Sequence, residues 1–167
     1  MILLMVDDEP IIIQTLARSI SIESLNIEKI LLAYSAEDAK RYFLNEPMID
    51  LVMCDIEMPQ TNGLALLSWI RANYPQTGCV FVTNYSVFQY AQEAIRLGCL
   101  DYILKPITPQ QITASIEKCI DKLHHPDKDL YLNQYLQKES LWHDMLFSYI
   151  SGHEYLSLIH ISEPTRR

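Results

Sequence analysis

Residues 2–8 read Ile-Leu-Leu-Met-Val-Asp-Asp, an unbroken apolar run that meets two carboxylates. Pro10 follows closely, and its fixed φ suits the first position of a helix. An apolar strand that leads through a polar turn into a helix is typical of an α/β fold with a parallel sheet. This stretch therefore predicts a first strand with Asp7 and Asp8 just past its carboxyl end.

Three later apolar runs also end on a polar residue of a kind that phosphoryl chemistry uses. They are Ile49–Cys54 before Asp55, Cys79–Val82 before Thr83, and Tyr102–Leu104 before Lys105. Ligands of an open parallel sheet bind in the crevice outside the carboxyl ends of the strands. We therefore expect three carboxylates, one hydroxyl and one ammonium to converge on a divalent-metal and phosphate site.

Helical patterns separate the apolar runs over residues 1–124. With a second strand near Lys29–Tyr34, five strand and helix units predict a parallel sheet with helices on both sides. The fifth helix has the clearest start, because Thr108 can cap it, Pro109 suits its first position and Gln111 completes a capping box. The first helix is expected to form one face from a set of five side chains: Ile12, Thr15, Leu16, Ser19 and Ile20.

Composition limits the classes of function. The chain has 167 residues, 49% of them hydrophobic, and a net charge of −8, which makes it a poor nucleic-acid binder by itself. Its four cysteines form no C-x-x-C pair, so we expect small core residues in a reducing cytosol, not disulfides or zinc ligands. No run approaches transmembrane length and the N-terminus is not a signal peptide, so we expect a cytoplasmic protein without a membrane partner.

The pattern changes after residue 124. Leu130–Ile150 is a long helical candidate with aromatic residues near heptad spacing, and it fits equally a coiled coil or a helix packed against a missing neighbour. We therefore divide the chain into a first domain at 1–124 and a helical linker or extension at 125–156, with a tail at 157–167. That tail resembles translated vector sequence, so we expect it to be non-native or disordered.

The carboxylates predict a magnesium site. Like charges this close disfavour joint ionisation unless a cation neutralises them, and Mg²⁺ prefers hard oxygen ligands while keeping several waters. We expect Asp8 and Asp55 to bind Mg²⁺ directly and Asp7 to act through water. The backbone carbonyl of Glu57 would complete the ligands from the protein.

Asp55 is also a candidate nucleophile, because carboxylates form aspartyl-phosphate intermediates. Lys105 would place an ammonium on one phosphoryl oxygen, and Thr83 would donate a hydroxyl to another. Taken singly, each residue also fits an ordinary cap, turn or strand position. The joint pattern at the strand ends favours the phosphate site.

With these residues the chain resembles a response-regulator receiver domain over residues 1 to about 124. The matching motifs are Val6-Asp7-Asp8-Glu9-Pro10, Asp55-Ile56-Glu57-Met58-Pro59 with Gly63, Thr83, and Tyr102-Ile103-Leu104-Lys105-Pro106. The resemblance implies a doubly wound, flavodoxin-like fold with strand order 2-1-3-4-5. It further implies Mg²⁺-dependent capture of a phosphoryl group on Asp55 from a sensor histidine kinase, and a cis Lys105–Pro106 bond.

The stretch from Asn84 to Ala91 looks most like receivers joined to an AraC-type DNA-binding region. This resemblance implies a transcriptional regulator that binds DNA only through a missing C-terminal domain. We further hypothesise that phosphorylation of Asp55 pulls Thr83 inward and that Tyr102 turns to fill the space, because both lie on neighbouring strands that lead to the site. The face of helix four, strand five and helix five, about Val87–Leu123, would then form a homodimer. Tyr102 has a simpler alternative as an aromatic that covers the sheet edge.

One position departs from the family pattern. Asn84 stands where receivers usually carry a small residue. Its side chain could hydrogen-bond near the phosphoryl group or hinder an incoming water, and either effect would change the lifetime of the phosphoryl group.

A phosphatase of the haloacid-dehalogenase type is a rival interpretation, but it needs an Asp where Glu57 stands. A receiver-like module that acts without phosphorylation is the other rival. We expect a signalling domain with self-catalysed phosphorylation and dephosphorylation only, not an enzyme.

Overall fold

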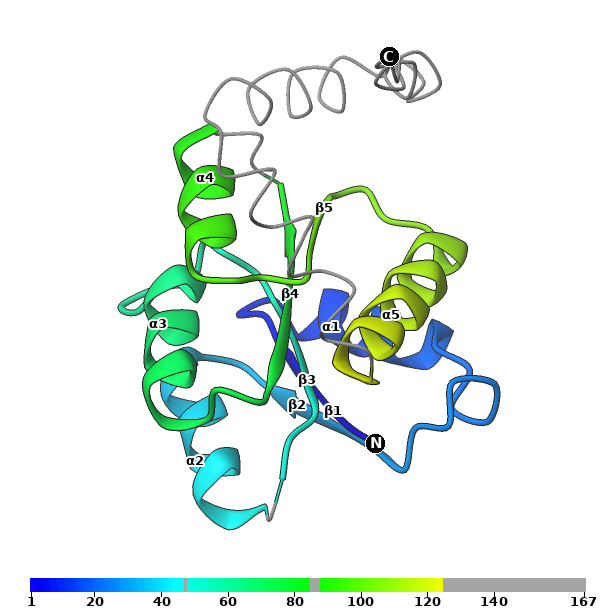
Figure 1. The fold of residues 1–167 in the computed structure, drawn as a ribbon. Coiled ribbons are helices and arrows are strands. Elements are labelled where there is room, and N and C mark those ends of the chain that lie inside the picture. The colour runs from blue at the N-terminus through cyan, green and yellow to red at the C-terminus, as the bar shows by residue number, and fades with distance from the viewer. Residues whose placement is uncertain (47, 85–87, 125–167) are drawn as a thin grey trace, which may run out of the picture. The chain divides into compact units, whose positions relative to one another are not determined.

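The computed structural model describes residues 1–46, 48–84 and 88–124 (Figure 1). Strands and helices alternate along them: β1 (Ile2–Val6), α1 (Pro10–Ser19), β2 (Lys29–Ala33), α2 (Ala36–Asn45), β3 (Leu51–Cys54), α3 (Gly63–Asn73), β4 (Gly78–Thr83), α4 (Phe88–Arg96), β5 (Asp101–Leu104) and α5 (Pro109–His124). The expected linker at 125–156, including the helical candidate Leu130–Ile150, and the tail at 157–167 lie outside the described residues.

The five strands form one parallel sheet in the order β2-β1-β3-β4-β5. This confirms the predicted doubly wound fold. Helices α1 and α5 cover one face of the sheet, and α2, α3 and α4 cover the other (Figure 1). After β1 the chain continues to β2 at one edge of the sheet, and after β3 it continues to β4 and β5 on the other side. Ligands of such sheets bind where the strand order reverses, so the crevice at the carboxyl ends of β1 and β3 is the expected ligand position.

Alternate side chains of each strand belong to two separate cores. In β1, Leu3 and Met5 pack with α1 and α5, whereas Leu4 and Val6 pack with α2, α3 and α4. Strands covered on both faces read as continuous apolar runs, because neither side of the sheet meets water. This explains why the runs before the polar residues were uninterrupted.

The fifth helix begins as the sequence predicts. The Thr108 backbone N–H donates to Gln111 Oε1 at 2.9 Å, and the Gln111 N–H donates to Thr108 Oγ1 at 3.3 Å. These reciprocal bonds are a capping box, with Pro109 at the first helical position.

The expected face of α1 was partly wrong. Its packed side chains are Ile13, Leu16 and Ala17, with Ile20 directly after the helix, whereas Thr15 is exposed and donates its hydroxyl to the Ile11 carbonyl. Three consecutive isoleucines open this helix, so the apolar pattern does not say which of them faces the sheet. The α1 backbone turns Ile13 inward and leaves Ile11 82% exposed.

All four cysteines are free thiols, and three of them are buried. Burial raises the pKa of both Cys99 and Cys119 to about 12, so both thiols stay protonated near neutral pH. No helix in the described part of the chain is long and apolar enough to cross a membrane.

Candidate functional site

The sheet brings the predicted residues to one end. Val6 and Cys54 are partners in the register of β1 and β3, so Asp7 and Asp55 leave neighbouring strands at the same level. The Asp55 N–H donates to the Val6 carbonyl at 2.9 Å. The Lys105 N–H donates to the Thr83 carbonyl at 2.8 Å. Backbone bonds therefore fix the residues that follow β3 and β5.

Three carboxylates form a cluster at this end. One oxygen from each of Asp7, Asp8 and Asp55 lies within 4.8 Å of the others. Asp7 and Asp55 are buried, and Asp8 is half-buried. Hard carboxylate oxygens with access to water are the donor set that Mg²⁺ prefers. The residues present therefore fit the expected metal.

Glu57 lies beside this cluster. Its backbone N–H donates to Asp55 Oδ1 at 3.4 Å, while its side chain is exposed. The backbone of Glu57 therefore lies close to the Asp55 carboxylate, as a carbonyl ligand from this residue would require.

Lys105 links the two buried carboxylates. Its Nζ lies 2.8 Å from Asp7 Oδ2 and 3.0 Å from Asp55 Oδ2, and its side chain is 8% exposed. The Lys105–Pro106 peptide bond is cis, as the resemblance implied. The ammonium therefore already lies where it can meet an oxygen of a group on Asp55.

Asp7, Asp55 and Lys105 form a triad in which burial and charge act in opposite directions on the pKa of Asp55 and on that of Lys105. Burial raises the pKa of Asp55 above its ordinary value, although Lys105 acts in the opposite direction. Burial by itself would lower the pKa of Lys105, but hydrogen bonds and charge from Asp7 and Asp55 raise it. Lys105 therefore remains a cation at neutral pH.

Thr83 and Tyr102 lie on the side of the sheet that faces α4. Thr83 is fully buried at the end of β4, two positions after Phe81 and thus on the same face. The Tyr102 ring, half-buried on β5, meets the Phe81 ring edge-on with centroids 6.4 Å apart. Burial, with smaller effects that include the Asp55 charge, raises the pKa of Tyr102 to about 12. Asn84 is exposed directly after Thr83.

Gly63 lets α3 approach the candidate phosphoacceptor. A Cβ at this position would clash with the Asp55 carbonyl oxygen and would lie 3.0 Å from Phe81 Cε1. The Gly63 N–H donates to the Ile56 carbonyl at 2.8 Å. The sequence indicated Gly63 only through the family motif, because the close approach depends on the placement of α3.

A contact from α4 was missed altogether. The Tyr90 hydroxyl donates to Glu57 Oε1 at 3.3 Å and joins residues 33 positions apart. No local pattern in the sequence signals this pair.

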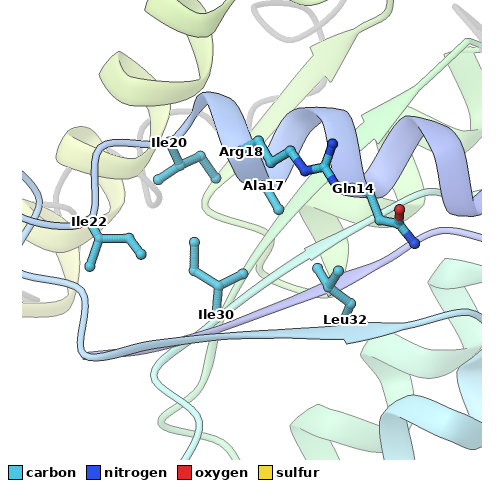
Figure 2. A pocket seen from close by; sticks show the side chains of 7 residues that line it. All are labelled: Gln14, Ala17, Arg18, Ile20, Ile22, Ile30 and Leu32. Carbon is cyan, nitrogen blue, oxygen red and sulfur yellow. The ribbon is translucent and has the colours of Figure 1, made fainter.

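An apolar groove lies elsewhere, between α1 and the edge strand β2 (Figure 2). Its volume is about 450 Å³, and its lining consists of Gln14, Ala17, Arg18, Ile20, Ile22, Ile30 and Leu32. None of the predicted site residues lines it. The candidate site is therefore the charged crevice at the strand ends, not this groove.

A methyl group at Gly63 should disturb the site directly. We expect Gly63→Ala to lower the free energy of unfolding by about 2 kcal/mol, because the clash is with backbone that cannot rotate away. It should also shift the amide resonances of residues 55–57. Gly98→Ala is the control, since its cost comes from a φ of 73° and its Cβ would meet nothing closer than 3.6 Å. Unmoved site resonances in Gly63→Ala would contradict the positioning role.

Removing the buried cation should leave the carboxylates unneutralised. We expect Lys105→Met to lower the free energy of unfolding in EDTA by about 3 kcal/mol, because a buried ion that loses its partner is strongly destabilising. Added Mg²⁺ should then stabilise this variant more than it stabilises the unchanged chain, since the metal supplies the lost charge. Denaturant unfolding with EDTA and with Mg²⁺ measures both effects.

Lys118→Met is the matched control. Lys118 Nζ lies 2.8 Å from Asp101 Oδ1, but its side chain is 53% exposed. Exposed ion pairs contribute about 0–1 kcal/mol, so this variant should lose little stability and gain no extra response to Mg²⁺. Equal behaviour of the two variants would count against the buried triad as a charged site.

Comparison with known proteins gives one consistent family. Residues 3–117 match the family model of the response regulator receiver domain. YesN of Bacillus subtilis, an uncharacterized transcriptional regulatory protein, is 33% identical over 125 residues, which are 75% of this chain and 34% of that protein. This chain thus spans about a third of the length of that relative.

Solved structures agree with the sequence match. The REC domain of AraT, a response regulator from Geobacillus stearothermophilus, has a TM-score of 0.68 at 35% identity. A two-component transcriptional regulator AraC from Clostridium phytofermentans has a TM-score of 0.69 at 27% identity. Each alignment covers 75% of this chain and 96% of the other.

Receiver domains are signalling domains that interact with histidine kinases. They usually bind Mg²⁺, and the acidic cluster at the strand ends agrees with such a metal site. The matched residues include both the sheet and the crevice that it forms. The chain belongs to the response-regulator receiver family of two-component systems.

Proposed function

We propose that Asp55 accepts a phosphoryl group from a sensor histidine kinase and that Mg²⁺ assists the transfer. Asp8 and Asp55 would bind the metal directly, Asp7 through water, and Glu57 through its backbone carbonyl. The observation that carries the proposal is the buried Lys105 ammonium, which contacts Asp7 and Asp55 at once.

The geometry supports a distinct role for each side chain. Asp55 presents its carboxylate at the crevice, with Oδ2 bound to Lys105 and Oδ1 near the Glu57 N–H. A P–O bond to Asp55 would form as the bond from phosphorus to the donor breaks, with the two reacting groups in line. Lys105 has three donor hydrogens, so it can keep Asp7 while it binds a phosphoryl oxygen. When bound, Mg²⁺ supplies charge that neutralises other phosphoryl oxygens.

The new dianion would act on Thr83 and Tyr102. Both lie on the face toward α4, so inward movement of the Thr83 hydroxyl would open space for the Tyr102 ring. Such a switch would change the surface of α4, β5 and α5 and favour a homodimer. Because YesN and the AraC structure are transcriptional regulators, we propose that the receiver controls transcription through an attached DNA-binding region in the cytoplasm.

The acceptor role is testable by intact mass. Incubation with acetyl phosphate should add one phosphoryl group, only when Mg²⁺ is present and only when residue 55 is Asp. Asp55→Asn is the control, because its amide has the same shape but cannot form the acyl phosphate. An adduct that persists in Asp55→Asn would overturn the assignment of the acceptor.

The absence of an adduct could mean that Asp55 is not an acceptor, or that the phosphoryl group is hydrolysed rapidly in the presence of Asn84. A titration with beryllofluoride and Mg²⁺ separates the two cases, because the bound fluoride complex imitates the phosphoryl group without being hydrolysed. Failure of both experiments would favour the module that acts without phosphorylation. Turnover of a generic phosphate ester would instead favour the phosphatase.

The coupling through Thr83 gives a second test. We expect Thr83→Ala to retain the mass adduct but to lose phosphorylation-linked dimerisation, because the hydroxyl that senses the phosphoryl group is gone. Light scattering with and without beryllofluoride measures the oligomeric state. Thr15→Ala, an exposed position on α1, is the control and should dimerise as the unchanged chain does. Undiminished dimerisation of Thr83→Ala would refute the coupling.

A further inference from the structure

Helix α4 is weakly attached through apolar contacts. Of its described residues, Phe88–Arg96, only Ala91 and Ala94 are buried. Alanine side chains bury little area, so they add little hydrophobic stabilisation. The position of α4 therefore depends on half-buried side chains such as Tyr90 and on its polar contacts.

The C-terminal end of α4 is anchored by Arg71 of α3. Its guanidinium donates from Nε to the Leu97 carbonyl at 3.0 Å and from Nη2 to the Gly98 carbonyl at 2.8 Å. A third bond runs from Nη1 to the Thr77 carbonyl at 2.5 Å. The planar Arg71 guanidinium thus joins the residues that follow α4 to Thr77, which follows α3.

Near its N-terminal end, α4 contacts the loop that carries the phosphoacceptor. Tyr90 packs against the same core as α3, and its hydroxyl donates to Glu57 Oε1 at 3.3 Å. Glu57 follows Asp55 by two residues and donates its own N–H to the Asp55 carboxylate. Tyr90 and Tyr102 both pack against this core. Tyr90 therefore connects α4 with the acceptor loop, on the face of the sheet that also carries Tyr102.

We propose that the Tyr90–Glu57 hydrogen bond is a latch that holds α4 in the unphosphorylated position. A phosphoryl group on Asp55 opens the latch, and α4 then turns about the end that Arg71 anchors. The driving force is the change in charge and contacts that the phosphoryl group and Mg²⁺ bring to the loop of residues 55–57, which carries the Glu57 carboxylate. The inference rests on the proposed function, and it makes Tyr90 a positioning residue that never touches the phosphoryl group.

Beryllofluoride with Mg²⁺ is the probe for this latch. Tyr90→Phe removes only the hydroxyl, so the latched form loses one hydrogen bond and the activated form loses none. We expect about 2- to 10-fold tighter beryllofluoride binding, the range that corresponds to one net hydrogen bond. Amide chemical-shift titration gives the dissociation constant. A purely structural role would instead change thermal stability and leave this constant unchanged.

Tyr74→Phe is the matched control. The Tyr74 hydroxyl also makes a 3.3 Å hydrogen bond, to the Phe43 carbonyl, but it joins α2 to α3. Its loss should leave beryllofluoride affinity unchanged. Glu57→Ala removes the other half of the latch and keeps the backbone carbonyl, so adding Tyr90→Phe to it should have no further effect.

The outcomes separate the latch from the acceptor role. Tyr90→Phe with unchanged affinity, or an effect of Tyr90→Phe that persists in Glu57→Ala, would overturn the latch and leave the acceptor intact. Failure of the unchanged chain to bind beryllofluoride would overturn both. If Tyr90→Phe does not fold, Glu57→Ala alone decides, and affinity that is no tighter than in the unchanged chain refutes the latch.

Discussion

The contact of one buried ammonium with two buried carboxylates is the constraint on which the site depends. Lys105, Asp7 and Asp55 come from the ends of three strands, and their side chains are at most 8% exposed. Moving such charges out of water is costly, and apolar side chains of similar volume often stabilise a fold equally well. The triad is therefore poorly explained by stability alone. Its excess of negative charge, increased by Asp8, is better explained by a cation that arrives from solvent.

The sheet makes this triad possible with little help from loops. Parallel strands end at one edge, and the backbone bonds beyond β3 and β5 hold the next residues in register. Two apolar cores cover the faces, so only this edge and its opposite can carry polar groups. Gly63 then lets α3 lie directly against the Asp55 carbonyl. Fold and site are thus consequences of one pattern, apolar runs that end on chosen polar residues.

That pattern also explains which features could be predicted. Asp7, Asp8, Asp55 and Lys105 could be placed together because the ends of parallel strands coincide whatever the helices do. The face of α1 was partly wrong because Ile11, Ile12 and Ile13 are equivalent by hydropathy, and only packing on the sheet distinguishes them. The contacts of Tyr90 and Arg71 could not be predicted at all, since one depends on how α4 lies relative to the loop after β3 and the other on how α4 lies relative to α3. Short-range periodicity carries no information of that kind.

The helices differ in how easily a new charge can move them. Helix α3 buries Leu66, Leu67 and Ile70, and each such side chain stabilises its position by roughly 1.5–3 kcal/mol. A local change in polar contacts is too small to displace it. Helix α4 buries two alanines and is held by bonds to Glu57 and Arg71, whose strengths are of the same order as the effect of one phosphoryl group. Elements of low local stability are the ones that respond in allosteric change. The unequal burial of α3 and α4 would therefore direct a response to phosphorylation of Asp55 into α4.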